Sequence, residues 1–409
     1  MRRGTNVHAL GGFNQTVILD TIRRAHDGAS RVEIAERTGL SAQTVSNVSR
    51  RLLDAGIIRQ GAQLILGAGK PRTILHLDSS SLYAVGVHID PAVVTYVIID
   101  LAGRVVAHAA KRTPSAARPD RVIAAMLVSI EAIIQTSGVD RGRVLGVGIA
   151  APGPVDLDRG VVLDPPLLQG WHGVALREAL SKATGLLVLL EKDVTAAAVA
   201  ELWMSKGHER DNFVFFYYGT GVGVGLALGH EAVRGSTSNA GDAGHIIIDP
   251  AGPMCTCGRR GCLGDAVIQR RLVELAIERG VVDAPGRPLD PGLVDESFTR
   301  MAALAQEGDP QASLILDEMA WRVAAAMVTI VNLLDVDHVV FGGPFWERVS
   351  GFLQPRLPEL INSSSALATT HPILVTGSTI GDDVTAVGAA CLVLESALSP
   401  RPSSMLISV

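Results

Sequence analysis

The sequence predicts an α/β protein in which a small N-terminal helical domain, residues 1–78, precedes a larger two-lobed body, residues 79–409. The first observation behind this prediction is a change of charge along the chain. Residues 1–76 contain eleven Lys and Arg against five Asp and Glu, whereas the whole chain has a net charge of −5. The second observation is an order of three strand-like runs, a helix and a further strand, which occurs twice after residue 78. A basic domain on an acidic body indicates nucleic acid as the partner of the N-terminal part.

Composition and hydropathy exclude several classes of protein. The chain has 409 residues, of which 47% are hydrophobic and 19% charged, so it can bury sizeable cores and is not disordered. The longest apolar stretch, Val323 to Leu334, is much shorter than the roughly twenty residues that a membrane-spanning helix needs. No secretion signal follows Arg2 and Arg3, and the four cysteines are too few for a disulfide framework. We therefore expect a cytoplasmic protein that does not contact a membrane.

Three helices are expected in the N-terminal part. Apolar residues at three-and-four spacing predict the first over Phe13–His26 and a second over Arg31–Thr38. Gly39 can adopt the left-handed conformation that ends a helix, and Ser41 is a preferred N-cap for a third helix that runs to about Ala55. Two short helices joined by a glycine turn predict a helix-turn-helix.

A basic hairpin completes this domain and favours DNA as its partner. The segments Gly56–Arg59 and Ile74–Leu77 alternate as two strands around a glycine-rich, basic tip at residues 67–72. Such a wing can reach the minor groove or phosphates, and small or amide side chains at the start of the third helix can bond base edges. A helical hairpin with a solvated face is the alternative, but helix, wing and charge together favour DNA. The candidate DNA contacts are Ser41, Gln43, Thr44, Ser46, Asn47, Arg50, Lys70 and Arg72.

The body repeats one order of elements. The first set is predicted at 83–89, 93–100, 104–110, 119–136 (the helix) and 144–150. The second set is predicted at 213–218, 222–228, near 230–233, 312–334 (the helix) and 338–341. Two such sets predict a duplicated ribonuclease-H-like, actin/hexokinase-like architecture with a ligand cleft between two lobes. We expect the first lobe at about 82–193 together with a C-terminal helix at about 383–398, and the second lobe at about 194–382.

Three of the four cysteines form a compact motif with metal-ligand spacing. Cys255 follows His245 by ten residues, and Cys257 and Cys262 come two and seven residues after Cys255. Three thiolates and an imidazole are a closed tetrahedral ligand set typical of structural zinc, and two glycines inside the motif permit tight turns. Three buried free cysteines are the alternative, which the spacing and a reducing compartment disfavour. We expect one structural Zn²⁺ per chain.

Further motifs occur in the order seen in the ROK family, which comprises sugar kinases and sugar-responsive repressors with an N-terminal winged helix. These motifs are VGIAAPGPV at 147–155, Gly170-Trp171, EKD at 191–193 followed by Ala196-Ala-Ala, GTGVGVG at 219–225, GDAGH at 241–245 and CTCGRRGCL at 255–263. The chain resembles the repressors of this family over its whole length. The resemblance implies that His245, Cys255, Cys257 and Cys262 bind zinc, and that His245 also reaches the sugar.

The resemblance also locates the phosphate loops of ROK kinases. Gly219, Thr220, Gly221 and Gly223 match one ATP phosphate loop. The other loop, Asp-x-Gly-x-Thr in the kinases, is replaced here by HIDPA at 88–92. An aspartate repels phosphate and a proline has no N–H to donate. We therefore predict that ATP-dependent phosphoryl transfer is lost and that the chain is not an enzyme.

The sugar site that the resemblance implies is only partly kept. Asp193 matches the kinase general base, and without ATP it would only bond a sugar hydroxyl; its alternative role is to cap the helix at 196–204. Lys192, Asp242 and Gly264 stand where the family has Asn, Glu and Glu. The candidate effector contacts are Lys192, Asp193, Asp242 and His245.

Lys192 allows three hypotheses for this pocket. Its ammonium can receive an anionic ligand such as a sugar phosphate or a sugar acid. It can instead pair with Asp193 or Asp242 and fill the pocket itself, so that no effector binds. It can also extend into solvent and have no role in binding.

We interpret the chain as a DNA-binding transcriptional regulator, a repressor of carbohydrate-metabolism genes, that binds a sugar or sugar-derived effector between its lobes. One recognition helix makes few contacts, so we expect a homodimer or homotetramer on a palindromic double-stranded DNA operator. The first alternative is an ATP-dependent sugar kinase with an accessory DNA-binding domain. The second is a zinc-responsive sensor, which a closed and tightly binding metal site disfavours.

Overall fold

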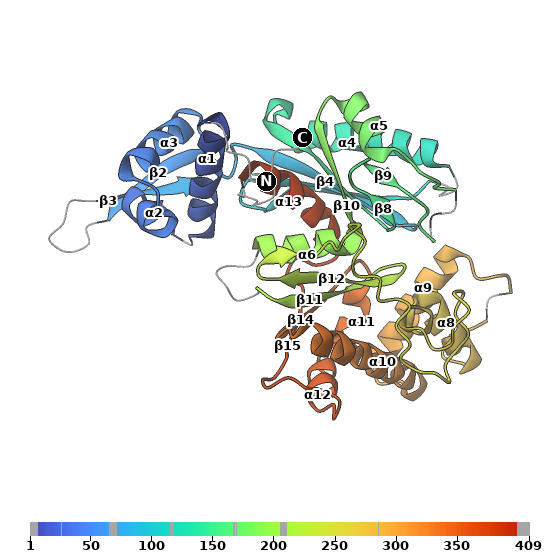
Figure 1. Cartoon of the computed structure of the whole chain (residues 1–409). Coiled ribbons are helices and arrows are strands. Elements are labelled where there is room, and N and C mark those ends of the chain that lie inside the picture. Colours follow the sequence, from blue (N-terminus) through green and yellow to red (C-terminus); the bar gives the residue numbers. More distant parts are fainter. Residues whose placement is uncertain are drawn as a thin grey trace.

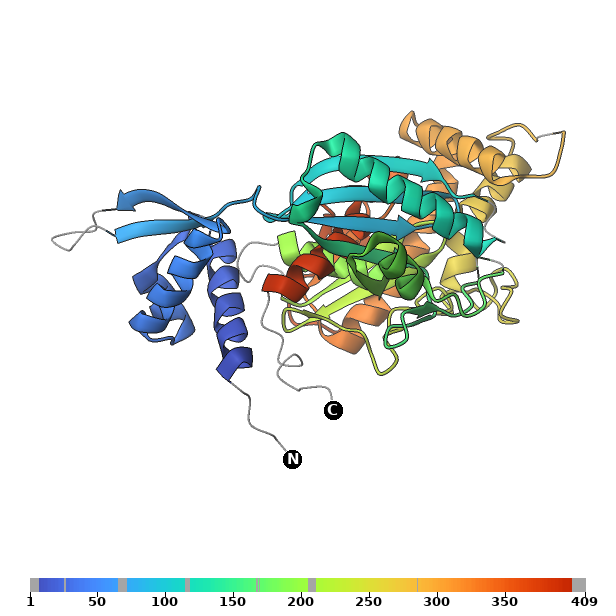
Figure 2. The ribbon, with the colours of Figure 1, turned by 90° about the horizontal axis from the view of Figure 1, so that it is seen from above.

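The computed structural model describes residues 7–25, 27–64, 72–114, 118–166, 168, 170–204, 211–284 and 286–398. A small N-terminal domain stands at one end of a larger body (Figures 1 and 2). The body is built on two five-stranded sheets, each packed against helices. In the described part of the chain, no helix is long and apolar enough to cross a membrane.

The N-terminal domain is a winged helix-turn-helix. Its elements are α1 (Val7–Arg24), β1 (Ala29–Ser30), α2 (Arg31–Thr38), α3 (Ala42–Asp54), β2 (Ile58–Leu64) and β3 (Arg72–Leu77). Gly39 ends α2 with a left-handed φ of 68°, and the Ser41 side chain caps α3 by accepting the amide of Thr44. β2 and β3 are antiparallel, and β1 pairs with the other edge of β3. Residues 65–71, which include Lys70 and most of the wing tip predicted at 67–72, lie outside the described residues.

Several boundaries differ from the predicted ones. α1 begins at Val7 rather than Phe13, because two glycines near its start do not interrupt the helix. β2 begins at Ile58 because Gly56, with a left-handed φ of 68°, forms the turn after α3. The helix expected at 196–204 already begins at Asp193, directly where the preceding strand ends.

The first sheet of the body has the strand order β10-β7-β4-β5-β6. Its strands are β4 (Tyr83–Ile89), β5 (Val93–Asp100), β6 (Val105–Arg112), β7 (Val144–Ala151) and β10 (Leu187–Lys192). The first three strands are antiparallel neighbours, and β7 and β10 are parallel to β4. The helices packed on this sheet are α4 (Pro119–Ser137), α5 (Leu176–Thr184) and α13 (Val384–Leu398). The connections between these elements include a 3₁₀ turn (Arg141–Arg143) and the short pair β8 (Val155–Asp156) and β9 (Val161–Val162).

The second sheet has the order β13-β12-β11-β14-β15, which repeats the third-second-first-fourth-fifth topology of the first sheet. Its strands are β11 (Phe213–Tyr218), β12 (Val222–Leu228), β13 (Glu231–Ala232), β14 (His338–Gly342) and β15 (Leu374–Gly377). The helices of this half are α6 (Asp193–Met204), α7 (Leu263–Val267), α8 (Gln269–Glu278), α9 (Pro291–Gln306), α10 (Pro310–Leu334), α11 (Trp346–Leu353) and α12 (Leu357–Asn362). The repeated topology confirms the predicted duplication of a ribonuclease-H-like unit.

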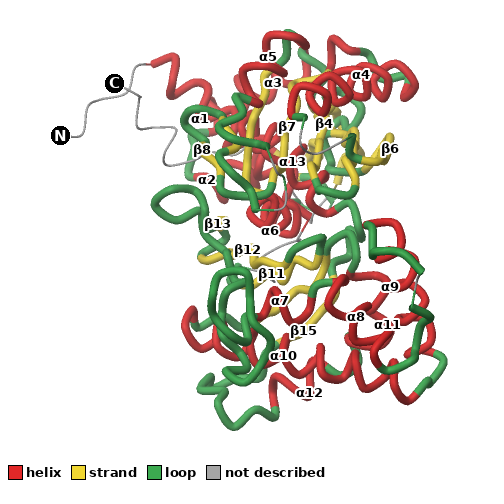
Figure 3. The backbone as a smooth tube through the Cα atoms, turned by 90° about the vertical axis from the view of Figure 1, so that its right-hand side faces the viewer, coloured by secondary structure: helices red, strands yellow, loops and turns green. Residues whose placement is uncertain are grey.

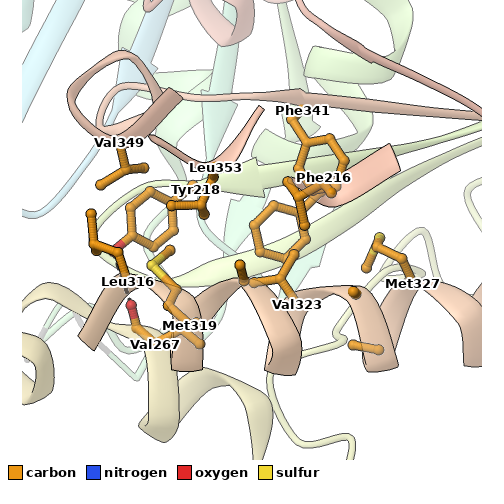
Figure 4. Packing of buried hydrophobic residues seen from close by; sticks show 14 of the residues in the cluster. Phe216, Tyr218, Val267, Leu316, Met319, Val323, Met327, Phe341, Val349 and Leu353 are labelled. Carbon is orange, nitrogen blue, oxygen red and sulfur yellow. Dashed lines mark hydrogen bonds between the residues drawn. The ribbon is translucent and has the colours of Figure 1, made fainter. Parts of the chain in front are cut away.

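The core of the second half forms between its sheet and the long helix α10. Phe216, Tyr218 and Phe341 from the strands face Leu316 and Val323 on α10 (Figure 4), and all five side chains are buried. Such aromatic and branched side chains supply most of the apolar area that the fold removes from water. The predicted apolar stretch 323–334 is therefore the end of a helix that buries one face, whereas Thr329, Asn332 and Leu333 are exposed.

Two helices, α6 and α13, lie between the two sheets (Figure 3). α13 packs on β4, β5 and β7 of the first sheet, whereas α6 packs on β11, β12 and β13 of the second. The two helices contact each other so closely that a β-carbon on Gly388 would collide with the backbone oxygen of Ala196. This crossing holds the two halves together and places the start of α6 at the edge between them.

We expect Gly388→Ala to lower the free energy of unfolding by about 1–3 kcal/mol, because the added methyl must push two packed backbones apart. Gly351→Ala is the matched control, because only the flexible Gln306 side chain lies near that position of α11. It should be neutral or stabilising by up to about 1 kcal/mol, the usual gain of replacing a helical glycine. Urea unfolding followed by circular dichroism measures both, and equal effects would contradict this account of the crossing.

Candidate functional site

The outward face of α3 carries three of the predicted DNA contacts. Gln43, Asn47 and Arg50 are exposed at a spacing of one and two helical turns, opposite the buried Val45, Val48 and Leu52. The Gln43 Nε2 amide donates to Asn47 Oδ1 at 3.2 Å, which aligns the two amides along the helix.

The other predicted DNA contacts cap the start of α3 or are half-buried. The Ser41 hydroxyl lies 2.9 Å from the Thr44 hydroxyl and accepts the Thr44 amide, so both residues serve the start of α3. Ser46 is half-buried. Arg72, also half-buried, begins β3 at the base of the wing. Among the predicted contacts on α3, the side chains of Gln43, Asn47 and Arg50 are thus exposed and have no role in capping the helix.

The two loops that match the phosphate loops of ROK kinases bind each other. The buried Asp90 carboxylate accepts the Thr220 hydroxyl at 2.7 Å and the Thr220 amide at 3.4 Å. The Gly219 amide is also used, because it donates to the Gly221 carbonyl oxygen within the turn. A carboxylate thus occupies donors that would otherwise face a phosphate.

A buried histidine and tyrosine lie beside this contact. His88 Nε2 is 3.3 Å from the Tyr217 hydroxyl, and both side chains are almost fully buried. Burial lowers the pKa of His88 to about 4, so the imidazole is neutral near pH 7. His88 therefore adds no positive charge that could balance a nucleotide phosphate. Tyr217 is a residue that the sequence did not single out, because it sits in an apolar strand run.

Lys192 is the last residue of β10, and its ammonium group is buried. Its Nζ donates to the backbone oxygens of Asn239 and Ala240, each at 3.0 Å, and only 7% of the residue is exposed. The hypothesis that Lys192 extends into solvent is therefore wrong. In the described residues, no ion pair joins Lys192 to Asp193 or Asp242, so pairing with a carboxylate is not the arrangement found.

Asp193 begins α6 next to Lys192. Its Oδ1 accepts the adjacent Val194 amide at 2.7 Å. Burial raises the pKa of this carboxyl to about 6, although the charge of Lys192 acts in the opposite direction. Asp242 and His245, which were expected in the same pocket, are both exposed on the following loop. The structure thus places Lys192 and Asp193 side by side and leaves the other two contacts toward solvent.

The loop before Asp242 ties the two halves of the body together. Asn239 accepts the Val155 amide and donates to the Val155 carbonyl oxygen, each at 2.8 Å. Arg234 forms a 2.7 Å ion pair with Glu191, whose side chain is almost fully buried. Sequence reasoning missed both residues because a hydrogen bond between distant loops has no periodic signal in the chain.

The four predicted metal ligands converge. Their ligand atoms all lie within 4.8 Å of one another, with His245 Nδ1 3.7 Å from Cys255 Sγ and Cys257 Sγ 3.6 Å from Cys262 Sγ. A tetrahedral metal with bonds of about 2.3 Å to sulfur separates its ligands by roughly 3.8 Å, so these distances fit a bound ion.

Backbone geometry explains why the cysteines can converge. Gly258 and Gly261 both have left-handed φ angles, of 84° and 71°, and a β-carbon on Gly261 would collide with the backbone oxygen of Asp249. A backbone hydrogen bond from Arg259 is the largest influence on the Cys257 thiol and lowers its pKa to about 6. The thiolate is the form that binds metal.

The sequence model of the ROK family matches residues 84–396. The chain belongs to the ROK family. A second model, winged helix-turn-helix DNA-binding, matches residues 15–59. The N-terminal domain found in the structure thus precedes a ROK body.

Among known proteins, the chain is similar to both regulators and kinases of this family. It is 24% identical over 392 residues to the xylose repressor of Caldicellulosiruptor bescii, covering 95% of this chain and 96% of that protein. It is 25% identical over 377 residues to the DNA-binding transcriptional dual regulator NagC of Escherichia coli, covering 90% and 89%. The glucokinase of Thermotoga maritima is 28% identical over 244 residues, which cover 55% of this chain and 74% of the kinase.

Solved structures show the same division. A ROK family transcriptional regulator described as a homologue of E. coli Mlc aligns with a TM-score of 0.76 and 23% identity, covering 95% of this chain and 98% of that one. A ROK glucokinase from Streptomyces griseus in complex with glucose and AMPPNP aligns with a TM-score of 0.64 and 26% identity, covering 76% and 98%. The regulator matches nearly the whole chain, whereas the kinase leaves about a quarter of it unmatched.

We expect the purified protein to carry one metal ion per chain, held by His245 and the three cysteines. Cys262→Ser should abolish the bound metal and lower the melting temperature, because the loop loses the ion that joins its ends. Cys391→Ala is the control, because Cys391 is buried in α13 and not part of the cluster. Elemental analysis by mass spectrometry measures the metal; metal retained at full occupancy in Cys262→Ser would contradict this ligand set.

Proposed function

We propose that this protein is a transcriptional regulator that binds DNA through its winged helix-turn-helix and represses carbohydrate-metabolism genes. The observation that carries the proposal is the exposed face of α3 with Gln43, Asn47 and Arg50. Asparagine and glutamine amides can bond the N6 and N7 atoms of adenine in the major groove, and arginine contacts guanine or phosphate. The similarity to xylose repressors and NagC supports a role in controlling sugar genes.

The proposed regulator binds a palindromic operator as a homodimer or homotetramer. One recognition helix of this size contacts only a few base pairs, which is too little for a specific site. Two copies joined through their bodies would place two such helices on successive turns of one DNA face. Lys70 and Arg72 would then contact phosphates or the minor groove from the wing.

The proposed protein is not a sugar kinase. The hydrogen bonds from Thr220 to Asp90 support this, because the carboxylate takes the amide and hydroxyl that a phosphate would need. A nucleotide would have to displace a buried negative charge from these donors. The kinase relatives also leave about a quarter or more of the chain unmatched, whereas the regulators match nearly all of it, which supports regulation as the main activity.

The proposed effector is a sugar derivative with an anionic group, bound where β10 ends and α6 begins. An ammonium group has three donors, and two of those on Lys192 are used by carbonyl oxygens. The remaining donor can bond a phosphate or carboxylate, and Asp193 can accept a sugar hydroxyl. The alternative is that Lys192 with its two carbonyl partners fills the site and no effector binds.

A structural Zn²⁺ is the proposed metal. Three thiolates and an imidazole are the donor set that zinc prefers in closed tetrahedral sites. His245 would link this site to the effector pocket, because the GDAGH loop also follows the Asn239 contact. The ion would brace that loop and take no part in chemistry.

DNA binding is tested by selecting sites from a random-sequence DNA pool with the full-length protein. We expect one enriched half-site. Asn47→Ala should relax the sequence requirement at one base pair, because it removes a bidentate amide.

Arg72→Ala should weaken binding to all sequences and reduce the slope of log affinity against log salt by about one. Arg159→Ala, an exposed arginine of the body, is the charge-matched control; no enrichment by the wild type would refute the proposed function.

The effector proposal predicts that a sugar phosphate or sugar acid, but not the parent neutral sugar, raises the melting temperature. Lys192→Met should abolish this shift while the metal content stays unchanged, because the anion loses the ammonium group that would pair with it. Thermal-shift measurements with paired neutral and anionic sugars provide the test. Stabilisation by neutral sugars alone would overturn the anionic effector, and no stabilisation by any sugar would favour the self-filled pocket.

A further inference from the structure

The N-terminal domain is fastened to the body through the last turn of α1. The Arg23 guanidinium stacks over the Trp203 ring at 4.0 Å, and its Nη1 donates to the Trp203 backbone oxygen at 3.0 Å. Trp203 lies in the last turn of α6, so the guanidinium also meets the negative end of that helix dipole. The Arg23 side chain is only 10% exposed. A buried, stacked and hydrogen-bonded arginine holds one orientation far better than a surface ion pair does.

A second arginine makes a second contact one residue later. Arg24 Nη1 lies 2.8 Å from His230 Nε2, and His230 Nδ1 lies 3.0 Å from Asp211 Oδ1. Because arginine can only donate, Nε2 must accept and the ring proton must lie on Nδ1, where it bonds Asp211. Burial is the largest influence on His230 and, together with Arg24, lowers its pKa, which agrees with a neutral ring. His230 lies in the turn between β12 and β13, so this contact reaches the second sheet.

Asp20 holds both arginines in place. Its Oδ1 accepts Arg23 and its Oδ2 accepts Arg24, each at 2.8 Å. A cavity of about 210 Å³ remains between α1 and the body, lined by these three residues together with Trp203, His230 and others. Ile18, Leu19 and Ile22 of α1 also belong to one buried apolar cluster with residues of α6 and α13, so the domain and the body share an apolar contact besides the polar one. We call Arg23, Arg24, Trp203 and His230 the α1 joint.

The domain is also attached to the first sheet at a separate point. The segment between β3 and β4 is short, and its Ser79 carbonyl oxygen accepts the Leu101 amide from the end of β5. At the same segment, the Asp78 amide donates to the Ile57 carbonyl oxygen of the N-terminal domain. α1 further packs on α13, the helix that covers the first sheet. The N-terminal domain is therefore anchored to both halves of the body, to one half through this segment and to the other through the α1 joint.

α6 connects the joint with the candidate effector site. It begins at Asp193, beside Lys192, and its last turn carries Trp203. Twelve helical residues span about 18 Å, and a helix packed along its whole length moves as a rigid unit. Ten of its residues are buried, so α6 cannot shift without moving the side chains around it. Any displacement of its first turn is thus carried to Arg23.

We propose that the α1 joint fixes the orientation of the winged helix-turn-helix on the body and transmits movement of α6 at the effector site to the DNA-binding domain. This inference rests on the proposed function, because it names the route by which the effector site acts on DNA binding. The domain is attached to the first half through the segment before β4 and to the second half through the α1 joint. If one half rotates against the other, the domain must therefore turn or the joint must break. In a dimer on DNA, the turn changes the separation of the two recognition helices.

The joint itself is tested first without DNA. Small-angle X-ray scattering of the full-length protein should fit one fixed arrangement of domain and body. The double variant Arg23→Ala/Arg24→Ala, and independently Trp203→Leu on the body side, should broaden the distance distribution while circular dichroism stays unchanged. Arg37→Ala, an exposed arginine of the same domain, is the control. A double variant whose scattering matches the wild type would overturn the joint, whatever the protein binds.

Transmission is tested by the spacing of half-sites selected from random DNA. The wild type should select one spacing, and the double variant should keep the same half-site but accept several spacings. Asn239→Ala, which unties the two halves near the effector site, should also broaden the spacing. Added to the double variant it should have no further effect, because both changes act through one route.

The outcomes separate the two proposals. If Asn239→Ala and the double variant broaden the spacing additively, the joint does not transmit movement from the effector site and the inference fails. If the spacing of the double variant stays single, the joint does not set the orientation and the inference also fails. If the wild type enriches no DNA at all, the proposed function fails, and the scattering comparison still decides whether the joint exists.

Discussion

The structure depends on one contact, the crossing of α6 and α13 at Ala196 and Gly388. The absence of a side chain on Gly388 lets two helix backbones touch, and the sheets on either side are held back to back as a result. The crossing also fixes the positions of the two ends of α6. Its first residue, Asp193, lies at the edge between the halves, and its last turn meets α1 of the N-terminal domain. A looser crossing would leave both ends without a fixed relation.

Charged groups at the edge between the halves find their partners inside the protein. Asp90 of the first half binds Thr220 of the second, Glu191 binds Arg234, and the Lys192 ammonium binds the Asn239 carbonyl oxygen. Buried charges without partners would cost several kcal/mol each, so these contacts stabilise the arrangement of the halves seen in the structure. The proposed effector would have to compete with such contacts, and its effect on DNA binding would be limited by how differently it bound two arrangements of the halves.

Much of the fold was predictable because its signals are local. The strands Tyr83–Ile89 and Val93–Asp100 match their predicted bounds, since each is a continuous apolar run between turn residues. Gly39 and Ser41 mark the turn between two helices for the same reason. The metal cluster was predictable because its spacing is short. The contacts of Asn239, Arg234 and His230 were not, because they join residues that are distant in sequence and carry no periodic pattern. The sequence left the placement of the Lys192 side chain open, and the structure shows that it is buried. Its partners are backbone carbonyl oxygens, which every residue has, so no residue type in the sequence marks them.

The way the N-terminal domain is attached bears on how a regulator of this architecture can work. A domain tethered only by a flexible segment would search DNA independently of the body, and no event at the effector site could alter it. A domain attached to one half alone would move with that half and would not respond to the position of the other. Here the segment at Ser79 binds the first half, and the arginines of α1 reach α6 and the turn at His230. On the proposed route, this double attachment converts a change in the angle between the halves into a change in the orientation of α3. The polar contacts at α1 are not alone, because Ile18, Leu19 and Ile22 of α1 belong to one buried apolar cluster with residues of α6 and α13. A rotation driven at the effector site, as proposed, would therefore work against this apolar packing as well as against the arginine contacts, and the cavity beside Arg23 and Arg24 is a part of the interface that side chains do not fill.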